Sequence, residues 1–182
     1  MIEIRIHGRG GQGAVIASEV LASAFFKEGK YVQAFPAFGV ERRGAPVAAY
    51  TRVDEQPIRL RHFIYEPDHI IILDPTLIES TQVDAGLKEN GWIVINTDRD
   101  PKTFGRFSRF RVATVDANRI ALENKLGSPT APIVNTAILG AFAKITGMVS
   151  ADAVVEAMKE FVPVNKAGNA AAIKEAYERA VA

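Results

Sequence analysis

The sequence predicts an α/β protein with a mostly parallel sheet, helices on both faces of that sheet and a helix-rich carboxyl end. Three observations carry this prediction. The chain opens with an alternating strand, a glycine-rich turn and a helix, which is how a βαβ unit begins. The runs at 69–74 and 92–96 are almost wholly aliphatic, as in parallel strands covered on both faces. From residue 117 onward the apolar spacing is helical.

The amino-terminal segment predicts two strands around one helix. Residues 2–7 alternate apolar and polar side chains, which indicates a strand with unlike faces. A glycine-rich turn follows at 8–13, and then a helix whose apolar residues recur every three or four positions until Gly29 ends it. Residues 31–35 are expected to form the next strand, which gives a Rossmann-like start to the chain.

The segment 46–62 departs from simple strand–helix alternation. Residues 47–53 and 58–61 are β-like, and the turn-forming residues 54–57 join them. This pattern predicts an antiparallel excursion attached to the parallel sheet.

The remaining elements follow in a regular order. Strands are expected at 69–74, 92–96 and 111–116, with a helix at about 75–89 and a loop at 97–109. Further helices are expected at 117–126, 133–146, 151–161 and 169–181. Because no linker or internal repeat interrupts this order, residues 1–182 are expected to form a single domain.

The composition argues against several classes of function. The net charge is +1, so no nucleic-acid partner is expected. No apolar run approaches the roughly 18–20 residues that a membrane span needs, so no membrane association is expected. The chain has no cysteine and three histidines, which argues against disulfides, a thiol nucleophile and a metal site. A reducing, cytoplasmic location fits the absence of cysteine.

The glycine-rich turn is the first candidate site. Gly8, Gly10 and Gly13 give the G-x-G-x-x-G spacing, directly after a strand and at the opening of a helix. Glycines at 8, 10, 11 and 13 allow a ligand to approach the backbone closely, and the helix N-terminus offers N–H groups to a phosphate. Arg9 and Gln12 add side-chain donors. The alternative is that the glycines only let strand, turn and helix pack closely.

A nicotinamide dinucleotide is disfavoured as the ligand of this turn. Such a site has an acidic residue at the end of the second strand to hold the ribose hydroxyls. Residues 31–35 contain no Asp or Glu, and Glu28 falls at the end of the preceding helix. A phosphate-bearing ligand of another kind is compatible with the turn.

Two further segments carry candidate binding residues. Arg42 and Arg43, next to Gly44, suit bidentate binding of a phosphate or carboxylate, although either arginine could instead pair locally with Glu41. The same candidate group includes Arg59, Arg61 and His62. Asn135 could present its amide to a ligand, or serve as an ordinary capping residue at a helix start.

The sequence displays no self-sufficient catalytic centre. It holds no Ser/His/Asp arrangement, carboxylate pair or metal-ligand spacing, so no catalytic residue is assigned. Asp74, which follows a buried strand, is expected to form a turn, and His7 is expected to have a structural role.

Several short motifs follow one another along nearly the whole chain. They are Gly8-Arg-Gly-Gly-Gln-Gly13, Phe35-Pro-Ala-Phe-Gly-Val-Glu-Arg-Arg-Gly-Ala-Pro46, Glu66-Pro-Asp68, Leu73-Asp-Pro-Thr-Leu77, Ile95-Asn-Thr97, Asn135-Thr136 and Leu139-Gly-Ala141. Together these motifs resemble one family, the gamma subunits of the pyruvate or 2-oxoacid:ferredoxin oxidoreductases.

The resemblance implies a complex that oxidatively decarboxylates a 2-oxoacid, transfers the acyl group to coenzyme A and reduces ferredoxin. Thiamine diphosphate, Mg²⁺ and iron–sulfur clusters would sit on partner alpha, beta and ferredoxin-like delta subunits, with ferredoxin as the external acceptor. This chain would bind coenzyme A as co-substrate and be inactive alone. Its binding residues would be Gly8, Arg9, Gly10, Gly11, Gln12, Gly13, Arg42, Arg43, Gly44 and Asn135.

Two other functions are compatible with the sequence. One is a stand-alone nucleotide-binding Rossmann-like oxidoreductase. The other is a non-catalytic adaptor subunit whose glycine-rich turn only packs against partners. Within the family, the loop pattern slightly favours pyruvate over 2-oxoisovalerate and 2-oxoglutarate as the substrate.

Overall fold

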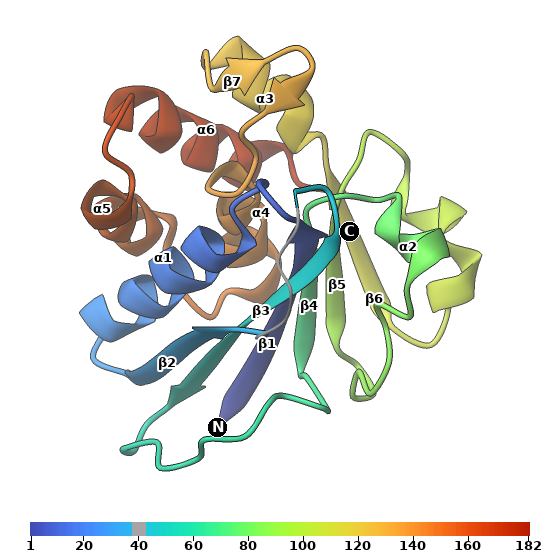
Figure 1. Ribbon diagram of the computed structural model, residues 1–182, viewed down its shortest axis with the longest axis vertical. Coiled ribbons are helices and arrows are strands. Elements are labelled where there is room, and N and C mark those ends of the chain that lie inside the picture. The colour runs from blue at the N-terminus through green and yellow to red at the C-terminus, as the bar shows by residue number, and fades with distance from the viewer. Residues whose placement is uncertain (38–42) are drawn as a thin grey trace.

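A six-stranded sheet forms the centre of the computed structural model, which describes residues 1–37 and 43–182 (Figure 1). Its strands are β1 (Ile2–Arg9), β2 (Tyr31–Pro36), β3 (Pro46–Asp54), β4 (His69–Ile72), β5 (Trp92–Asn96) and β6 (Arg111–Val115). Their order is β2-β3-β1-β4-β5-β6. Among these strands only β3 is antiparallel to its neighbours, β1 and β2. The predicted mostly parallel sheet with an antiparallel excursion is therefore confirmed.

The second half of the excursion differs from the prediction. The segment 46–62 was expected to contain two strands, but only β3 forms, and residues 58–61 lie outside the sheet. Side chains of β2 and β3 hold the backbone at the two ends of this segment. Nε2 of Gln33 donates to the carbonyl of Ile58 at 3.3 Å, and Nη2 of the fully buried Arg52 donates to the carbonyl of His62, just past the segment, at 2.6 Å. β2 provides the antiparallel partner instead.

Helices cover the two faces of the sheet unequally. The helices are α1 (Ala14–Lys27), α2 (Leu77–Ser80), α3 (Ala117–Glu123), α4 (Ala137–Thr146), α5 (Ala151–Phe161) and α6 (Lys166–Arg179). Figure 1 shows α1, α4, α5 and α6 gathered on one side of the sheet and α2 on the other. On α2's side, the 3₁₀ turns Pro101–Thr103 and Gly105–Phe107 complete a smaller core. The predicted helices on both faces and the helix-rich carboxyl end are both confirmed.

The helix expected at 75–89 is mostly a series of turns. Only α2 is helical in this range. The carbonyls of Val83 and Ala85 accept hydrogen bonds from Nη2 of the buried Arg5, at 2.9 and 2.6 Å. Gly86 has a φ of +72°, and a Cβ there would lie 2.1 Å from the carbonyl oxygen of Tyr65. A continuous helix would use the carbonyls of Val83 and Ala85 in its own hydrogen bonds, so Arg5 could not bind them. It would also not allow the positive φ of Gly86.

The helices on the more heavily covered face of the sheet pack in two layers. α1 and α4 lie against the sheet, while α5 packs on α1 and α6 packs on α4. The contact between α4 and α6 is close, because a Cβ at Gly140 would lie 1.9 Å from the carbonyl oxygen of Ile173. A two-stranded ribbon, β7 (Gly127–Ser128) with β8 (Ala131–Pro132), joins α3 to the segment before α4. Within the described ranges, no helix is both long and apolar enough to cross a membrane.

Candidate functional site

A cavity of about 730 Å³ lies at the carboxyl edge of the sheet. The chain leaves β1 toward β2 on one side and leaves β4 toward β5 on the other, so this edge is a topological switch point, where open α/β sheets bind ligands. The cavity is lined by Arg9–Gly13 after β1, by Arg43 and Gly44, by Leu73 after β4, by Asn118 of α3 and by residues 130–135 before α4.

The structure brings most of the predicted site residues to this cavity. Gly8 is an exception: it is buried within β1 opposite Val47, and a Cβ there would lie 3.1 Å from Cδ1 of Leu73. The turn therefore begins at Gly10, two residues later than expected, and Gly8 belongs to the strand, where Leu73 leaves little room for a side chain. Arg42 lies in 38–42, outside the described residues.

The glycine-rich turn adopts a backbone that favours glycine. Gly11 and Gly13 have φ angles of +96° and +78°. Gly10 donates to the carbonyl of Ala45 at 2.9 Å and accepts from Gly44 at 3.0 Å, which ties the turn to the loop before β3. Gly13 is the N-cap of α1, and no described side chain caps this helix. The amino end of α1 thus keeps its partial positive charge at the cavity.

The side chains of Arg9 and Gln12 are engaged within the protein. Arg9 donates from Nε to Asp74 Oδ2 at 3.0 Å, from Nη1 to the carbonyl of Gly44 at 3.1 Å and from Nη2 to Thr76 Oγ1 at 2.8 Å. Gln12 accepts from the Arg9 backbone at 2.7 Å and donates to Asp74 Oδ2 at 3.1 Å. The donors predicted at Arg9 and Gln12 line the cavity, and their bonds within the protein shape the turn.

Asp74 has a larger role than the turn-forming one expected from the sequence. Besides Arg9 and Gln12, its carboxylate accepts from the backbone and the hydroxyl of Thr76, at 3.0 and 2.6 Å. Burial by itself raises the pKa of Asp74, but the bonds from Thr76 and Gln12 and the charge of Arg9 outweigh it and hold the pKa below its usual value. The position of Asp74 directly after a buried parallel strand was the sequence signal for this role.

Arg43 supplies the cavity with a cationic side chain. It forms an isolated parallel bridge with Gly10, and its Cγ would lie 4.0 Å from a Cβ built on Gly11. Arg43 is exposed, and no described residue accepts a hydrogen bond from its guanidinium. Because Asp74 balances the charge of Arg9, Arg43 and the amino end of α1 together favour an anionic ligand.

Asn135 closes the cavity beside the turn and is only 4% exposed. Its Nδ2 donates to the carbonyl of Gly13 at 3.4 Å, while its Oδ1 has no hydrogen-bond partner in the described part of the chain. The alternative role as a helix cap is not observed, since Thr136 is the N-cap of α4 and no described side chain caps that helix.

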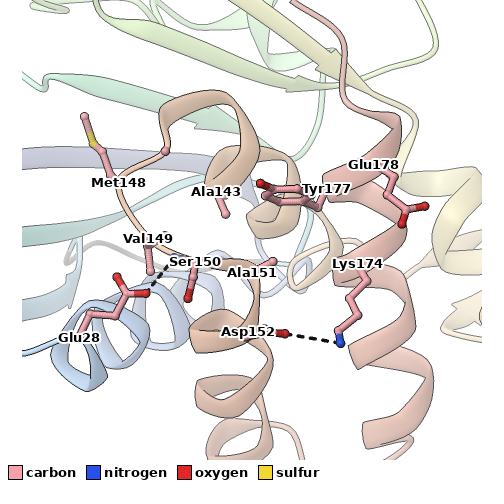
Figure 2. A pocket seen from close by; sticks show the side chains of 11 residues that line it. Glu28, Ala143, Met148, Val149, Ser150, Ala151, Asp152, Lys174, Tyr177 and Glu178 are labelled. Atoms are coloured by element: carbon pink, nitrogen blue, oxygen red, sulfur yellow. Dashed lines mark hydrogen bonds and ion pairs between the residues drawn. The ribbon is translucent and has the colours of Figure 1, made fainter.

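Glu28 lies at the far end of α1 from the cavity. It is the C-cap of α1, and its Oε1 accepts from the backbone of Ser150 at 3.0 Å (Figure 2). The strand order adds a second argument against a dinucleotide, because β3 separates β2 from β1. Loop residues Arg43 and Gly44 therefore stand near the end of β1, where a dinucleotide fold would place its acidic ribose ligand.

Figure 2 shows a second cavity, of about 650 Å³, at the junction of α1, α4, α5 and α6. Two of its charged side chains pair, since Lys174 lies 3.5 Å from Asp152, and a third, Glu28, accepts from the backbone of Ser150 at the amino end of α5. These contacts join helices, so we assign this cavity to the packing of the domain.

The fold and the carboxyl-edge cavity define an α/β protein with a site suited to an anionic ligand. The chain belongs to the pyruvate ferredoxin/flavodoxin oxidoreductase family, whose model matches residues 3–179. It is 54% identical to the common gamma subunit of the pyruvate/ketoisovalerate oxidoreductases of Thermococcus kodakarensis, over 100% of this chain and 98% of the relative. The chain is therefore a gamma subunit of a 2-oxoacid:ferredoxin oxidoreductase, an enzyme complex of several subunits.

The solved structures similar to this chain include two oxidoreductases. The pyruvate oxidoreductase subunit PORC of Thermotoga maritima is 36% identical, with a TM-score of 0.82 over 99% of this chain and 97% of that one. The 2-oxoglutarate:ferredoxin oxidoreductase of Magnetococcus marinus, solved with 2-oxoglutarate, coenzyme A and succinyl-CoA bound, is 18% identical. Its TM-score is 0.74 over 97% of this chain and 30% of that chain, which shows a shared fold.

Proposed function

We propose that this gamma subunit binds coenzyme A in the carboxyl-edge cavity and holds it for acyl transfer within the complex. The complex would convert a 2-oxoacid, coenzyme A and oxidised ferredoxin to acyl-CoA, CO₂ and reduced ferredoxin. The observation that carries the proposal is the meeting of the uncapped amino end of α1 with Arg43 in one cavity.

The chemistry of coenzyme A fits both the cationic part of this cavity, at the glycine-rich turn, and its less polar part, at residues 133–135. Its pyrophosphate and 3′-phosphate require N–H groups and arginines, and it needs no acidic ribose ligand. Gly10, Gly11 and Gly13 would receive a phosphate, with Arg43 and Arg42 as charge partners. Asn135 and the apolar residues Ile133 and Val134 would line the uncharged part of the ligand.

The redox chemistry would lie on other chains. Iron–sulfur clusters are held by cysteine thiolates, and this chain has no cysteine, so it does not fit such a cluster. Thiamine diphosphate with Mg²⁺ would carry the decarboxylation on partner alpha and beta subunits, and a ferredoxin-like delta subunit would pass electrons to ferredoxin. This chain would form a single domain and work in the cytoplasm. It would position the thiol of coenzyme A, which accepts the acyl group, and would be inactive alone. Pyruvate is the favoured substrate.

Arg43→Ala tests the proposal in the assembled complex. We expect the Kd for coenzyme A, measured by calorimetry without 2-oxoacid, to rise about tenfold, because a charge-assisted bond to a phosphate is lost. Arg59→Ala, a change at an exposed arginine outside the cavity, is the matched control and should leave Kd unchanged. Equal affinity in the wild-type and Arg43→Ala complexes would remove Arg43 from the site and favour an adaptor role for this loop.

A further inference from the structure

The wall of the cavity that α3 provides carries an amide group with a fixed orientation. Asn118 is the second residue of α3 and lines the cavity. Its Oδ1 accepts a hydrogen bond from Nδ2 of Asn96 at 3.2 Å. Asn96 is the last residue of β5 and is 2% exposed, and its Nδ2 also donates to the carbonyl of Leu73 at 2.9 Å. A chain of hydrogen bonds thus runs from the end of β4 through Asn96 to Asn118.

The donors and acceptors in this chain of bonds fix the orientation of the side-chain amides of Asn96 and Asn118. A backbone carbonyl only accepts, so the carbonyl of Leu73 must face the nitrogen of Asn96. That nitrogen only donates, so Asn118 must turn its oxygen toward it. The Nδ2 of Asn118 is then the end of the amide that does not face Asn96, and it carries two N–H donors on an exposed side chain that lines the cavity. No described residue accepts a hydrogen bond from this Nδ2.

Two observations separate this arrangement from ordinary packing. Asp116 already caps α3, since its Oδ1 accepts from the Arg119 backbone at 2.9 Å, so Asn118 is not needed as a cap. The Oδ1 of Asn96 is buried and has no hydrogen-bond partner among the described residues. An unpaired buried acceptor costs about 1–3 kcal/mol. The side chain of Asn96 thus keeps its Nδ2 toward Leu73 and Asn118 although its oxygen is left unpaired.

We propose that Asn118 is a ligand-binding residue of this cavity and that Asn96 is the residue that positions it. This inference rests on the proposed function. Asn118 donates from Nδ2 to an acceptor oxygen of coenzyme A, which offers such oxygens on its phosphates and on the amide carbonyls of its pantetheine arm. Asn96 keeps the donor end of Asn118 turned toward the ligand.

Asn118→Asp in the assembled complex tests the ligand contact. The aspartate keeps the shape of the side chain and still accepts from Asn96, but it presents a carboxylate where the donor was. We expect Kd for coenzyme A to rise at least about tenfold, with kcat at saturating coenzyme A nearly unchanged. Asn90→Asp, which adds the same charge at the exposed turn before β5, at the opposite edge of the sheet, should leave Kd unchanged.

Fragments of the ligand identify the acceptor oxygen. If Asn118 contacts a phosphate, Asn118→Asp weakens inhibition by ADP; if it contacts a carbonyl, it weakens inhibition by pantetheine. A wild-type affinity for coenzyme A in the Asn118→Asp complex overturns the inference and leaves the proposed function standing. If the Arg43→Ala complex and the Asn118→Asp complex both bind coenzyme A with wild-type affinity, the inference and the proposed function are both overturned.

A double-mutant cycle tests the positioning role of Asn96. Asn96→Ala should weaken coenzyme A binding several-fold when residue 118 is Asn, and should have no further effect when Asn118→Ala is also present. Equal weakening in both backgrounds would show that Asn96 acts through general stability. If Asn96→Ala prevents assembly, Asn96→Ser, which keeps a small donor, serves in the same cycle.

Discussion

Asp74 Oδ2 accepts a hydrogen bond from Arg9 Nε at 3.0 Å, and this ion pair joins the carboxyl ends of β1 and β4. The same oxygen also accepts from Gln12, so one carboxylate holds both long side chains of the glycine-rich turn. The turn is therefore organised before any ligand arrives. Preorganisation of this kind reduces the entropy that binding would otherwise cost.

Asp74→Asn should loosen the turn. The substitution removes the charge that balances Arg9 and weakens several charge-assisted bonds, so we expect a loss of about 1–3 kcal/mol in the free energy of unfolding. Coenzyme A affinity of the complex should fall as well. Urea unfolding and calorimetry measure the two effects. Asp98→Asn, at an exposed carboxylate after β5, is the control, and an Asp74→Asn protein as stable as this control would contradict the prediction.

Gly13→Ala should impair ligand binding more than Gly29→Ala does. Both glycines have left-handed backbone, with φ of +78° and +84°, so the two alanines carry similar backbone strain of about 1–2 kcal/mol. A Cβ at Gly13 would lie 2.5 Å from Nδ2 of Asn135, whereas no described atom lies within 4 Å of one at Gly29. Asn135 must then turn away from the cavity. Similar coenzyme A affinity in the two variants would show that Asn135 has no part in the site.

Gly140→Ala should destabilise the domain by about 2 kcal/mol or more. The added Cβ would meet the carbonyl oxygen of Ile173 at 1.9 Å, and a backbone atom cannot move aside without separating α4 from α6. This cost exceeds the roughly 1 kcal/mol by which alanine favours a helix over glycine. Thermal unfolding measures it. At Gly105, where no described atom lies within 4 Å of a Cβ, the same substitution should change Tm little.

His7 should make the protein sensitive to acid. Burial, together with the charge of Arg5, lowers the pKa of His7 to about 3, and its Nε2 accepts from Arg5 Nε at 3.0 Å. In the unfolded chain the same imidazole has a pKa of about 6.5. Between those two values the unfolded state binds the extra proton, so stability falls as the pH is lowered from about 6.5 toward 3.

The difference between wild-type protein and a His7→Gln variant isolates this effect. Glutamine can accept from Arg5 but does not titrate. We expect the wild-type free energy of unfolding to lose up to about 1.4 kcal/mol more than the variant for each pH unit below 6. Urea unfolding at several pH values between 4 and 8 measures the two slopes. Parallel slopes would show that His7 is protonated as readily in the folded protein as in the unfolded chain.

Local residue patterns were sufficient to predict the elements whose backbone makes only the hydrogen bonds of its own helix or sheet. The aliphatic run that contains β5 and the apolar spacing of α5 predicted those elements closely, because burial on both faces or on one stripe dictates the residue pattern. The expected strand at 58–61 and the helix at 75–89 failed for a common reason. Side chains distant in sequence bond to backbone carbonyls of these segments: Gln33 to that of Ile58, and the buried Arg5 to those of Val83 and Ala85.

The sequence by itself determined the α/β class, the glycine-rich turn and the family to which the chain belongs, since each depends on residue types at short spacing. Only the tertiary structure decided which side chains face the cavity. It directs Arg9 and Gln12 to Asp74, sets β3 between β1 and β2, and brings Asn118 to Asn96. These outcomes depend on hydrogen bonds between residues far apart in the sequence, and local residue patterns carry no information about such partners.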